Sequence, residues 1–499
     1  MTAPTFASIH ACGPWLFALM TAVGVVACGG SGSEVVALGN GNNGLPALES
    51  TPAYFLSPTT DTTPPVTGRK WYNVSNRVLD ADTSAMNPDD LSKLESDGTG
   101  QVMDFHHRDI RGRQRWNWNE GKGFRNSPLG GVPFTNTAYK PDDIRSLYAM
   151  PSLSTTAGAD LGAGQTVYVI SAFHAPRLTS DLQQFNSRFS LPACTNTNVP
   201  ASTSLPLVNS NTSCQLKVAY ATADGNLTDT APNYEARWAM ETTLDVSWVH
   251  ATAPHASIVL IEAADSSLTS MVGAIKLANK MGPGVVNMSF AIQEGSWVAN
   301  QEPLFSTAGM SYVAASGDNG TQVNWPAVSA QVLAVGGTTL SWDGTNRVES
   351  GWAGSGGGVS AFVGLPTYQS GVLWGSNALT ARTVPDVSFN ADPRSGQYVY
   401  FTNSQGVGRW VIAGGTSLAA PQWAGILAIH NARKGTVVKS SEVLAKLYLQ
   451  NLASHFWDIT VTSENSSRVC SYFSCEPLAG FDLVTGVGSP KVSSLLGAL

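Results

Sequence analysis

Short apolar runs alternate with helical stretches along most of the chain. From Thr137 onward, runs of β-branched and other apolar residues recur without the polar alternation of a half-exposed strand, at 167–171, 258–263, 285–290, 312–316 and 332–337. Such runs are typical of strands that are buried on both faces. The segment 267–282 between two of them has helical periodicity and ends in a glycine. This alternation predicts an α/β fold, a mainly parallel sheet flanked by helices.

The N-terminal part of the chain differs from the rest in amino-acid composition. Residues 29–136 are rich in Thr, Pro, Asn, Asp and Gly and poor in aliphatic runs, which indicates a tether and an irregular N-terminal region. Within it, arginines and tryptophans interleave between Arg108 and Arg125. Such a composition can stack on nucleic acid, but the cluster is short, and packing against the next domain or a processing site is the preferred interpretation.

The first residues resemble an export signal. Pro14 to Ala27 is apolar and uncharged but too short to span a bilayer, as in the core of a signal peptide. Val25-Val26-Ala27-Cys28, followed by glycines and serines, resembles a bacterial lipobox with Cys28 as the lipidated residue. We therefore expect 1–28 to be a lipoprotein-type signal peptide and the protein to be exported. It would be membrane-anchored, at the outer membrane or cell surface, or secreted if an ordinary secretory signal is cut nearby.

Composition and charge limit the kinds of partner that we expect the protein to bind. Charged residues make up 13% of the 499 residues and the net charge is -7, without a block of like charge. There is thus no general electrostatic reason to expect a nucleic-acid partner. The protein is expected to be a monomer.

Four cysteines remain beyond the signal and the lipid site. They are Cys194, Cys214, Cys470 and Cys475, which allow three pairings. Local disulfides, Cys194 with Cys214 and Cys470 with Cys475, suit the oxidising environment of an exported protein. A zinc site is the alternative, disfavoured because there is no C-x-x-C pair and no histidine close by in the sequence.

One serine stands where a nucleophile could be activated. Ser417 follows Gly414-Gly415-Thr416 and begins an apolar-periodic helix that ends at Gly435. At a helix N-terminus, free N–H groups and the helix dipole favour negative charge on an attacking alkoxide or a tetrahedral intermediate. The same pattern also serves as a plain helix cap, so a catalytic serine needs a base.

The expected histidine base is missing, and a carboxylate pair takes its place. No histidine lies in an H-G-T-H-like turn, and His250 and His255 are expected to be helix-cap or surface residues. Glu241 and Asp245 lie four residues apart on one face of the predicted helix 234–251. Mutual repulsion should raise the pKa of one carboxyl, so the pair could relay a proton in acid; two solvated carboxylates are the alternative.

A third carboxylate follows a predicted strand. Asp318 lies in Ser316-Gly317-Asp318-Asn319-Gly320, directly after the run 312–316. An aspartate there often only caps a turn. If it were protonated in an enclosed site, it could donate a hydrogen bond to an oxyanion.

Together these motifs resemble the sedolisins, or serine-carboxyl peptidases. The resemblance rests on E-T-T-L-D, S-G-D-N-G and G-G-T-S-L-A-A-P, and on segments 162–176, 324–340, 354–360, 384–393 and 479–490, and it covers 137–499. It implies a subtilisin-like fold for a peptidase domain 137–499. By that resemblance Ser417 is the nucleophile, Glu241 the general base, Asp245 the residue that orients and buffers it, and Asp318 the oxyanion donor.

The resemblance also implies binding residues. A peptide substrate would lie extended near Ser289, Phe290, Ser355, Gly356, Gly357 and Gly358. One structural calcium ion would be held by the side chains of Asp458 and Asp482 and by backbone oxygens of Ile459, Leu478 and Gly480. The chain departs from the family with Leu478 in place of a usual glycine and Ser289-Phe290-Ala291 in place of S-W-G.

The sequence therefore predicts an exported serine endopeptidase that forms an acyl-enzyme at Ser417 and prefers acid. Acid preference follows because Asp318 must be protonated to donate while Glu241 must be free to accept. The alternative is a non-catalytic cell-surface binding protein on the same fold. The family's usual large folded prodomain is not recognisable in 29–136, so the sequence does not indicate whether the protein inhibits or processes itself.

Overall fold

The computed structural model describes residues 45–56, 64–65, 70–72, 136–155, 157–207, 212–342, 345–461 and 476–499. The predicted lipid site Cys28, the Arg/Trp cluster, Cys470 and Cys475 lie outside these residues. Among the described residues, no helix combines the length and the apolar character needed to cross a bilayer.

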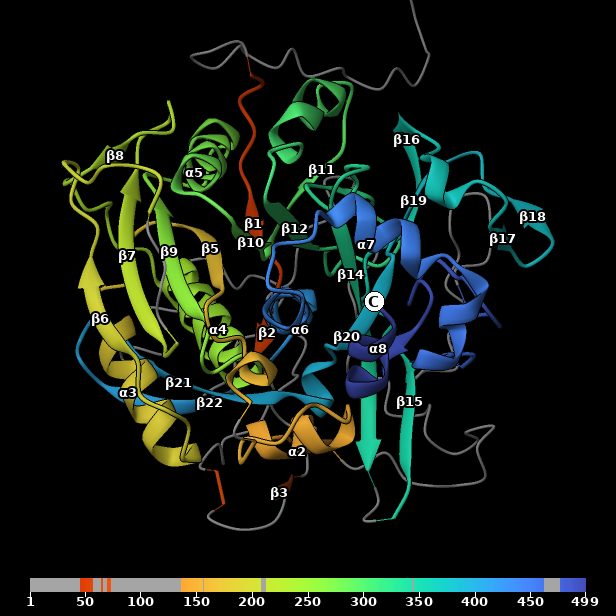
Figure 1. Ribbon diagram of the computed structural model, residues 1–499, viewed down its shortest axis with the longest axis horizontal. Coiled ribbons are helices and arrows are strands. Elements are labelled where there is room, and N and C mark those ends of the chain that lie inside the picture. Colours follow the sequence, from red (N-terminus) through yellow and green to blue (C-terminus); the bar gives the residue numbers. More distant parts are fainter. Residues whose placement is uncertain are drawn as a thin grey trace, which may run out of the picture. The chain divides into compact units, whose positions relative to one another are not determined.

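A ten-stranded sheet forms the centre of the described fold (Figure 1). Eight of its strands lie side by side in this order: β15 (Arg347–Gly351), β14 (Leu333–Trp342), β12 (Met310–Ala315), β10 (Gly284–Met288), β5 (Thr166–Ala172), β9 (Ser257–Ala263), β7 (Gln215–Ala221) and β6 (Thr195–Asn198). Neighbours along this path are parallel, except that β15 runs antiparallel to β14. At the flanks, β20 (Val387–Asn390) pairs parallel with β14, and β8 (Leu227–Thr228) pairs antiparallel with β7.

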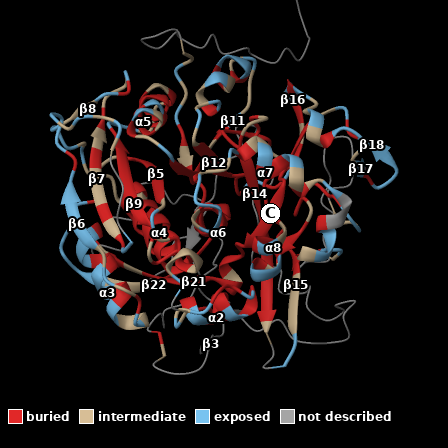
Figure 2. Ribbon diagram, in the orientation of Figure 1, coloured by how far each residue is buried: buried red, intermediate tan, exposed pale blue. Residues whose placement is uncertain are grey.

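Successive residues of the central strands enter two different apolar cores. Val167 and Val169 of β5 pack in the core that contains α4 (Ala236–Thr252) and α6 (Thr416–Lys434). Their neighbours Tyr168 and Ile170 pack in the core that contains α5 (Leu268–Met281). Both faces of the sheet are therefore covered, as Figure 2 shows by the buried strands and helices, and the predicted α/β architecture is confirmed.

Shorter elements surround the sheet. The remaining helices are α2 (Pro141–Leu147), α3 (Leu178–Phe189), α7 (Ser440–Leu447), α8 (Val492–Ala498) and the 3₁₀ turns η4 (Gly158–Leu161), η5 (Val298–Phe305), η6 (Thr367–Gln369), η7 (Pro393–Ser395) and η8 (Gln450–His455). The remaining strands are β1 (Thr51–Pro52), β2 (Phe55–Leu56), β3 (Lys70–Tyr72), β4 (Asn136–Ala138), β11 (Phe290–Gln293), β13 (Asn324–Trp325), β16 (Gly358–Gly364), β17 (Leu373–Trp374), β18 (Asn377–Ala378), β19 (Ala381–Val384), β21 (Gln397–Thr402), β22 (Gly408–Gly414), β23 (Phe456–Trp457) and β24 (Ser489–Pro490).

Part of the region that the sequence assigned to a tether belongs to this fold. Strand β1 pairs antiparallel with β11, and β2 pairs antiparallel with β22. Ala53 and Tyr54, which join β1 to β2, are buried in the core that contains α4 and α6. Residues 51–56 thus pair with strands of the fold and do not form a spacer.

Candidate active site

The carboxyl ends of β10 and β12 and the first turn of α6 meet at one place. Ser417 is the second residue of α6, after Gly415, whose backbone φ is 105°. A Cβ at Gly415 would lie 2.6 Å from Asp318 Oδ2 and would overlap the backbone of Ala53 and Tyr54. A glycine is therefore required here both for its left-handed conformation and for the close approach of three other groups.

Thr416 orients the carboxyl group of Asp318. Its backbone N–H and its hydroxyl each donate a 2.8 Å hydrogen bond to Asp318 Oδ1. The other oxygen, Oδ2, is buried and has no hydrogen-bond partner among the described residues. Burial raises the pKa of Asp318 to about 7, against the opposing effect of the two hydrogen bonds from Thr416. Below that pH the group is a neutral acid whose free oxygen can carry a proton.

Glu241 and Asp245 are buried one turn apart on α4, which packs against α6. Burial raises the pKa of Glu241, and the charge of Asp245 raises it further. The nearby Ser417 hydroxyl lowers the pKa of Glu241 and so opposes this rise. The hydrogen bond that this hydroxyl donates goes to the Ser289 carbonyl. Neither Glu241 oxygen has a well-aligned donor among the described residues, so this carboxyl is free to take a proton. The alternative of two solvated carboxylates is wrong.

Two residues at the end of β10 position Asp245. Ser289 Oγ donates a 2.6 Å hydrogen bond to Asp245 Oδ1, and Asn287 Nδ2 donates a 2.9 Å hydrogen bond to Ser289 Oγ. Burial raises the pKa of Asp245, while these two polar side chains lower it. The chain Asn287–Ser289–Asp245 was not foreseen from the sequence, although Asn287 and Ser289 flank a strand end, where such side chains gather.

Ser417 contacts a peptide unit of the chain's own N-terminal segment. Its backbone N–H donates a 2.8 Å hydrogen bond to the carbonyl oxygen of Ala53. Its hydroxyl accepts a 3.0 Å hydrogen bond from the Ala53 N–H and donates a 2.9 Å hydrogen bond to the carbonyl of Ser289. The structure thus brings Ser417, Glu241, Asp245 and Asp318 together around one extended peptide.

The chain has relatives among known protein families. The model of the subtilase family matches residues 219–468. The chain belongs to the subtilase family. Kumamolisin of Bacillus sp. (strain MN-32) is 30% identical over 394 residues, which cover 73% of this chain and 64% of kumamolisin. Sedolisin of Pseudomonas sp. (strain 101) is 26% identical over 317 residues, which cover 56% of this chain and 49% of sedolisin.

The fold of this subtilase is also that of a solved sedolisin. The structure of Pseudomonas sedolisin, a serine-carboxyl proteinase complexed with two molecules of pseudo-iodotyrostatin, aligns with a TM-score of 0.55 at 22% identity. The match covers 72% of this chain and 97% of that one. The resemblance to the sedolisins and the subtilisin-like fold are confirmed. The chain spans 64% of the length of kumamolisin and 49% of that of sedolisin.

The predicted substrate-binding residues fall in two places. Phe290 begins β11 and lies opposite Pro52, and Ser289 directly precedes it. The Ser355 hydroxyl, by contrast, is buried and bridges the Gly337 N–H and the Val484 carbonyl inside the fold.

The glycines after Ser355 pack against the turn that carries Asp318. The N–H of Gly356 donates a 2.6 Å hydrogen bond to the Gly317 carbonyl, and that of Gly357 a 2.9 Å hydrogen bond to the Gly320 carbonyl. Gly358 begins β16. The backbone of 356–358 therefore stabilises the Asp318 turn, and its contact with a substrate stays a prediction.

The predicted calcium residues lie together between β23 and β24. The Gly480 N–H donates hydrogen bonds of 3.2 and 3.0 Å to the two oxygens of Asp458, and the Leu478 N–H donates one of 3.4 Å to Asp482 Oδ2. One short loop thus contacts both carboxylates. With the carbonyl of Ile459, the residues present offer only oxygen ligands, which fits calcium.

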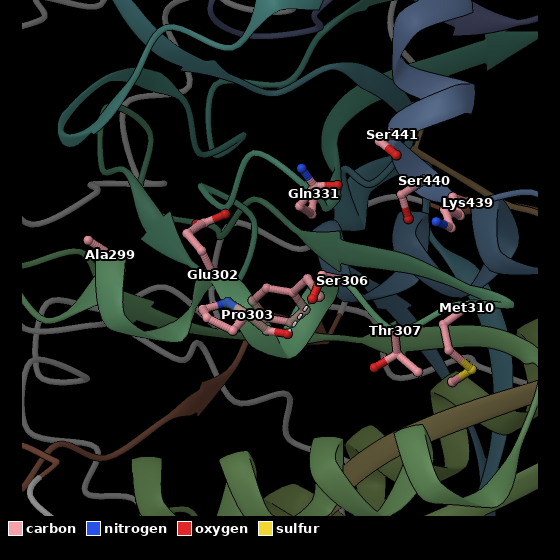
Figure 3. A pocket seen from close by; sticks show the side chains of 11 residues that line it. Ala299, Glu302, Pro303, Ser306, Thr307, Met310, Gln331, Lys439, Ser440 and Ser441 are labelled. Atoms are coloured by element: carbon pink, nitrogen blue, oxygen red, sulfur yellow. Dashed lines mark hydrogen bonds between the residues drawn. The ribbon is translucent and has the colours of Figure 1, made fainter.

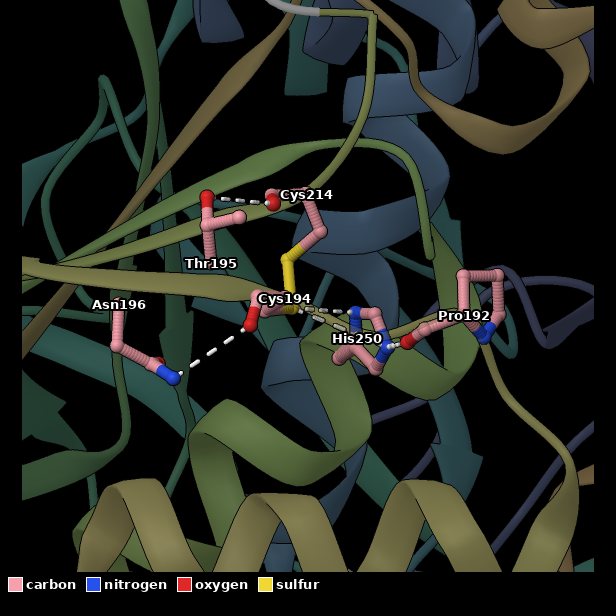
Figure 4. Close-up of a disulfide and its surroundings, with 6 residues drawn as sticks. All are labelled: Pro192, Cys194, Thr195, Asn196, Cys214 and His250. Atoms are coloured by element: carbon pink, nitrogen blue, oxygen red, sulfur yellow. Dashed lines mark hydrogen bonds between the residues drawn. A yellow bond between two sulfur atoms is a disulfide. The ribbon is translucent and has the colours of Figure 1, made fainter.

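His250 differs from its expected surface or cap position. It is fully buried at the end of α4, where Nε2 lies 2.8 Å from the Pro192 carbonyl and Nδ1 lies 3.4 Å from Cys194 Sγ (Figure 4). Burial lowers its pKa to about 4, so the ring is neutral. The chain therefore does bring a histidine to this cysteine pair. The sulfurs of Cys194 and Cys214 lie at disulfide distance from each other, which leaves no thiolate for a metal.

A separate pocket of about 510 Å³ lies between η5 and the start of α7 (Figure 3). Glu302, Gln331 and Lys439 line it, and none of the predicted catalytic residues does. It is distinct from the cluster around Ser417.

Proposed function

We propose that this protein is a serine-carboxyl endopeptidase. Ser417 acts as the nucleophile, Glu241 as its general base, Asp245 as the group that orients and buffers Glu241, and Asp318 as the donor to the oxyanion. The observation that carries the proposal is the peptide carbonyl of Ala53 on the Ser417 N–H, at the N-terminus of α6. This N–H is where negative charge on a tetrahedral intermediate would be stabilised.

These residues would act in a two-stage reaction. Ser417 Oγ attacks the substrate carbonyl carbon as Glu241 accepts its proton, and the negative charge of Asp245 makes Glu241 a stronger acceptor. The oxyanion accepts two hydrogen bonds, one from the Ser417 N–H and one from the protonated Oδ2 of Asp318. Glu241 then returns its proton to the leaving amine, and water hydrolyses the acyl-enzyme by the reverse sequence. Because the donor is a neutral carboxylic acid, the reaction favours acidic conditions.

The test is hydrolysis of a denatured protein by the full chain between acidic and neutral pH, with calcium present. Ser417→Ala and Glu241→Gln should each lower the rate by about three orders of magnitude or more. Thr243→Ser is the matched control, because Thr243 lies between the two carboxylates on α4 but bonds the Ala239 carbonyl of its own helix. Equal inactivity of wild type and variants at every pH would favour the non-catalytic binding protein.

We also propose one structural calcium ion at Asp458 and Asp482, with backbone oxygens of Ile459, Leu478 and Gly480. The proposal is supported by the donor set of these residues, two carboxylates and three backbone carbonyls, which are the oxygen ligands that calcium prefers. When bound, the ion would hold this loop against β23; it takes no part in the chemistry at Ser417.

Export and lipid anchoring through Cys28 form a further proposal, which rests on the sequence around that residue. Cys28→Ser should move the protein from the membrane fraction to the soluble fraction of its producing cells. Unchanged membrane association would exclude Cys28 as the anchor.

A further inference from the structure

Three side chains from separate parts of the chain meet at the disulfide (Figure 4). Cys194 lies one residue before β6, and Cys214 lies one residue before β7. These two strands pair in parallel, with Thr195 opposite Gln215, and the Thr195 N–H donates a 3.2 Å hydrogen bond to the Cys214 carbonyl. His250 comes from the last turn of α4. Regular secondary structure therefore fixes the backbone of all three residues.

The imidazole of His250 is held in one tautomer. Its Nε2 lies 2.8 Å from the carbonyl oxygen of Pro192, which can only accept a hydrogen bond, so Nε2 carries the proton. Burial lowers the pKa of the ring to about 4, so the ring carries no second proton at neutral pH. Nδ1 therefore presents its lone pair, and it lies 3.4 Å from Cys194 Sγ.

This lone pair receives no hydrogen bond from the sulfur that it faces. The sulfurs of a disulfide carry no hydrogen, and the imidazole is fully buried. Among the described residues, His250 has one hydrogen-bond partner other than Cys194, the Pro192 carbonyl at Nε2. Buried polar atoms in folded proteins nearly always have a partner. An unpaired buried nitrogen that faces two sulfurs is suited to a ligand that accepts electron pairs, such as a metal ion.

The three side chains suit the coordination of zinc. Zn²⁺ binds thiolate sulfur at about 2.3 Å and imidazole nitrogen at about 2.0–2.1 Å in tetrahedral sites. Tetrahedral angles at these bond lengths place the nitrogen about 3.5 Å from a sulfur, and Nδ1 of His250 lies 3.4 Å from Cys194 Sγ. Nδ1 and both sulfurs lie within 4.8 Å of one another. A zinc-bound histidine usually donates its other ring N–H to a carbonyl or carboxylate, as His250 does to Pro192.

We propose that Cys194, Cys214 and His250 bind one zinc ion when the disulfide between the two cysteines is reduced. A dithiol supplies the two electrons that break the S–S bond, is itself oxidised to a disulfide, and leaves two cysteine thiols. Zn²⁺ then binds both sulfurs and Nδ1, and the two thiol protons pass to solvent. Two thiolates balance the charge of the ion, so no net charge is buried. Cys194 is half-buried, so a water molecule can reach the fourth position.

Zinc would hold together more of the fold than the disulfide does. The disulfide joins only the starts of β6 and β7, and it closes a loop with a sequence separation of 20. Zinc would keep that loop closed and would also join it to α4, the helix that carries Glu241 and Asp245. The reduced protein would thus keep a cross-link at this point of the fold. The site does not depend on the peptidase function proposed above.

The test uses the full chain with Ser417→Ala in excess calcium, so that neither digestion nor the proposed calcium site affects the result. The protein is reduced with a phosphine, which leaves no thiol to compete for zinc, and the phosphine is removed without oxygen. Reduced Ser417→Ala should bind one more zinc ion per chain than the reduced double variant Cys194→Ser, Cys214→Ser in the same background. This comparison subtracts zinc that is bound by the other cysteines. The oxidised protein should lack this ion.

Two further measurements identify the ligands. Co²⁺ in place of Zn²⁺ should give reduced Ser417→Ala the visible absorption of tetrahedral thiolate coordination, and the double cysteine variant should lack the corresponding part of it. Zinc should also raise the Tm of reduced Ser417→Ala and leave that of the oxidised protein unchanged, because only the reduced fold binds the ion.

His250→Gln distinguishes a three-ligand site from a pair of free thiols. Its amide can still donate to the Pro192 carbonyl but offers no ring nitrogen to the metal, so the zinc affinity should fall by at least about 100-fold. His255→Gln is the matched control, because His255 follows the same helix but is not one of the three ligands, and its affinity should be unchanged.

Two results would overturn the proposal. One is that reduced Ser417→Ala binds no more zinc than the double cysteine variant, a comparison that needs no change at His250. The other is that His250→Gln, shown to be folded by circular dichroism, binds zinc as tightly as its parent.

Discussion

Thr416 donates both of its hydrogen bonds to the same oxygen of Asp318, each at 2.8 Å. The carboxyl is therefore fixed in one orientation, with its second oxygen directed at Gly415 and the peptide that lies there. An ionised carboxylate in this orientation could not stabilise an oxyanion, because its free oxygen would repel the negative charge. The pairing is suited to a protonated acid.

Asp318 should determine the upper pH limit of activity. Its pKa is about 7, so the proton that it donates is present below that pH and lost as the pH rises through it. In Asp318→Asn, the two hydrogen bonds from Thr416 would go to the amide oxygen, so the NH₂ group would face the substrate. This variant should retain activity within about tenfold and extend it above pH 7, whereas Asp318→Ala should lose about 10²–10³-fold. Equal losses in both variants, with an unchanged pH profile, would contradict the assignment.

The same burial should make the folded protein more stable in acid. An aspartate whose pKa is raised from 3.8 to about 7 contributes stability that is fully present below pH 4 and lost as the pH rises to 7. Asp318 alone would account for at most about 4 kcal/mol of this difference in the free energy of unfolding. Urea denaturation of Ser417→Ala at pH 4 and pH 7 measures the difference, and adding Asp318→Asn should reduce it. No reduction would show that Asp318 ionises normally.

Ser289 should act as a positioning residue for Asp245. Ser289→Ala removes a 2.6 Å hydrogen bond that lowers the pKa of Asp245, so the lower pH limit of activity should move upward. The loss of a hydrogen bond to a buried carboxylate is worth about 1.5–3 kcal/mol, or roughly 10–100-fold in kcat. Ser289→Thr keeps the hydroxyl and should restore the profile. A fall in kcat without any pH shift in Ser289→Ala would indicate a structural role only.

Removing calcium should destabilise the loop 478–480, whose backbone contacts Asp458 and Asp482. Treatment of Ser417→Ala with a calcium chelator should lower its Tm, and excess calcium should restore it, because a ligand that binds only the folded state stabilises it. Asp482→Asn should have a lower Tm that no longer responds to calcium. A Tm of Ser417→Ala that is insensitive to both treatments would exclude the ion.

Reducing the Cys194–Cys214 pair should destabilise the domain. A disulfide that closes a loop of this length, with a sequence separation of 20, contributes about 3 kcal/mol. Reductant should therefore lower the Tm of Ser417→Ala. The double variant Cys194→Ser, Cys214→Ser should have the lower Tm without reductant. Equal Tm values for oxidised Ser417→Ala and this double variant in the same background would show that the pair is not bonded.

Much of the architecture could be predicted because its signals are local. Unbroken apolar runs mark strands covered on both faces, and the predicted strand 167–171 is β5, Thr166–Ala172. The helix that follows Ser417 ends at Gly435, as predicted, because that residue takes the left-handed conformation of a C-cap. Each of these signals lies within a few residues of the element it predicts.

The candidate site was predictable where a motif carries its own geometry. Four-residue spacing on a helix is enough to place Glu241 and Asp245 on one face, whatever the rest of the fold. His250 shows the limit of such reasoning. It contacts Cys194, which lies 56 residues away in the chain, only through tertiary packing.

The strand across the active site was decided by tertiary structure alone. Ala53 and Ser417 are 364 residues apart, and the contacts between them are made by backbone N–H and C=O groups and a serine hydroxyl. Backbone groups are the same in every residue except proline, so no side-chain pattern marks the segment that will use them. The sequence by itself determined which residues could do the chemistry. Only the folded chain determined which peptide unit lies against Ser417.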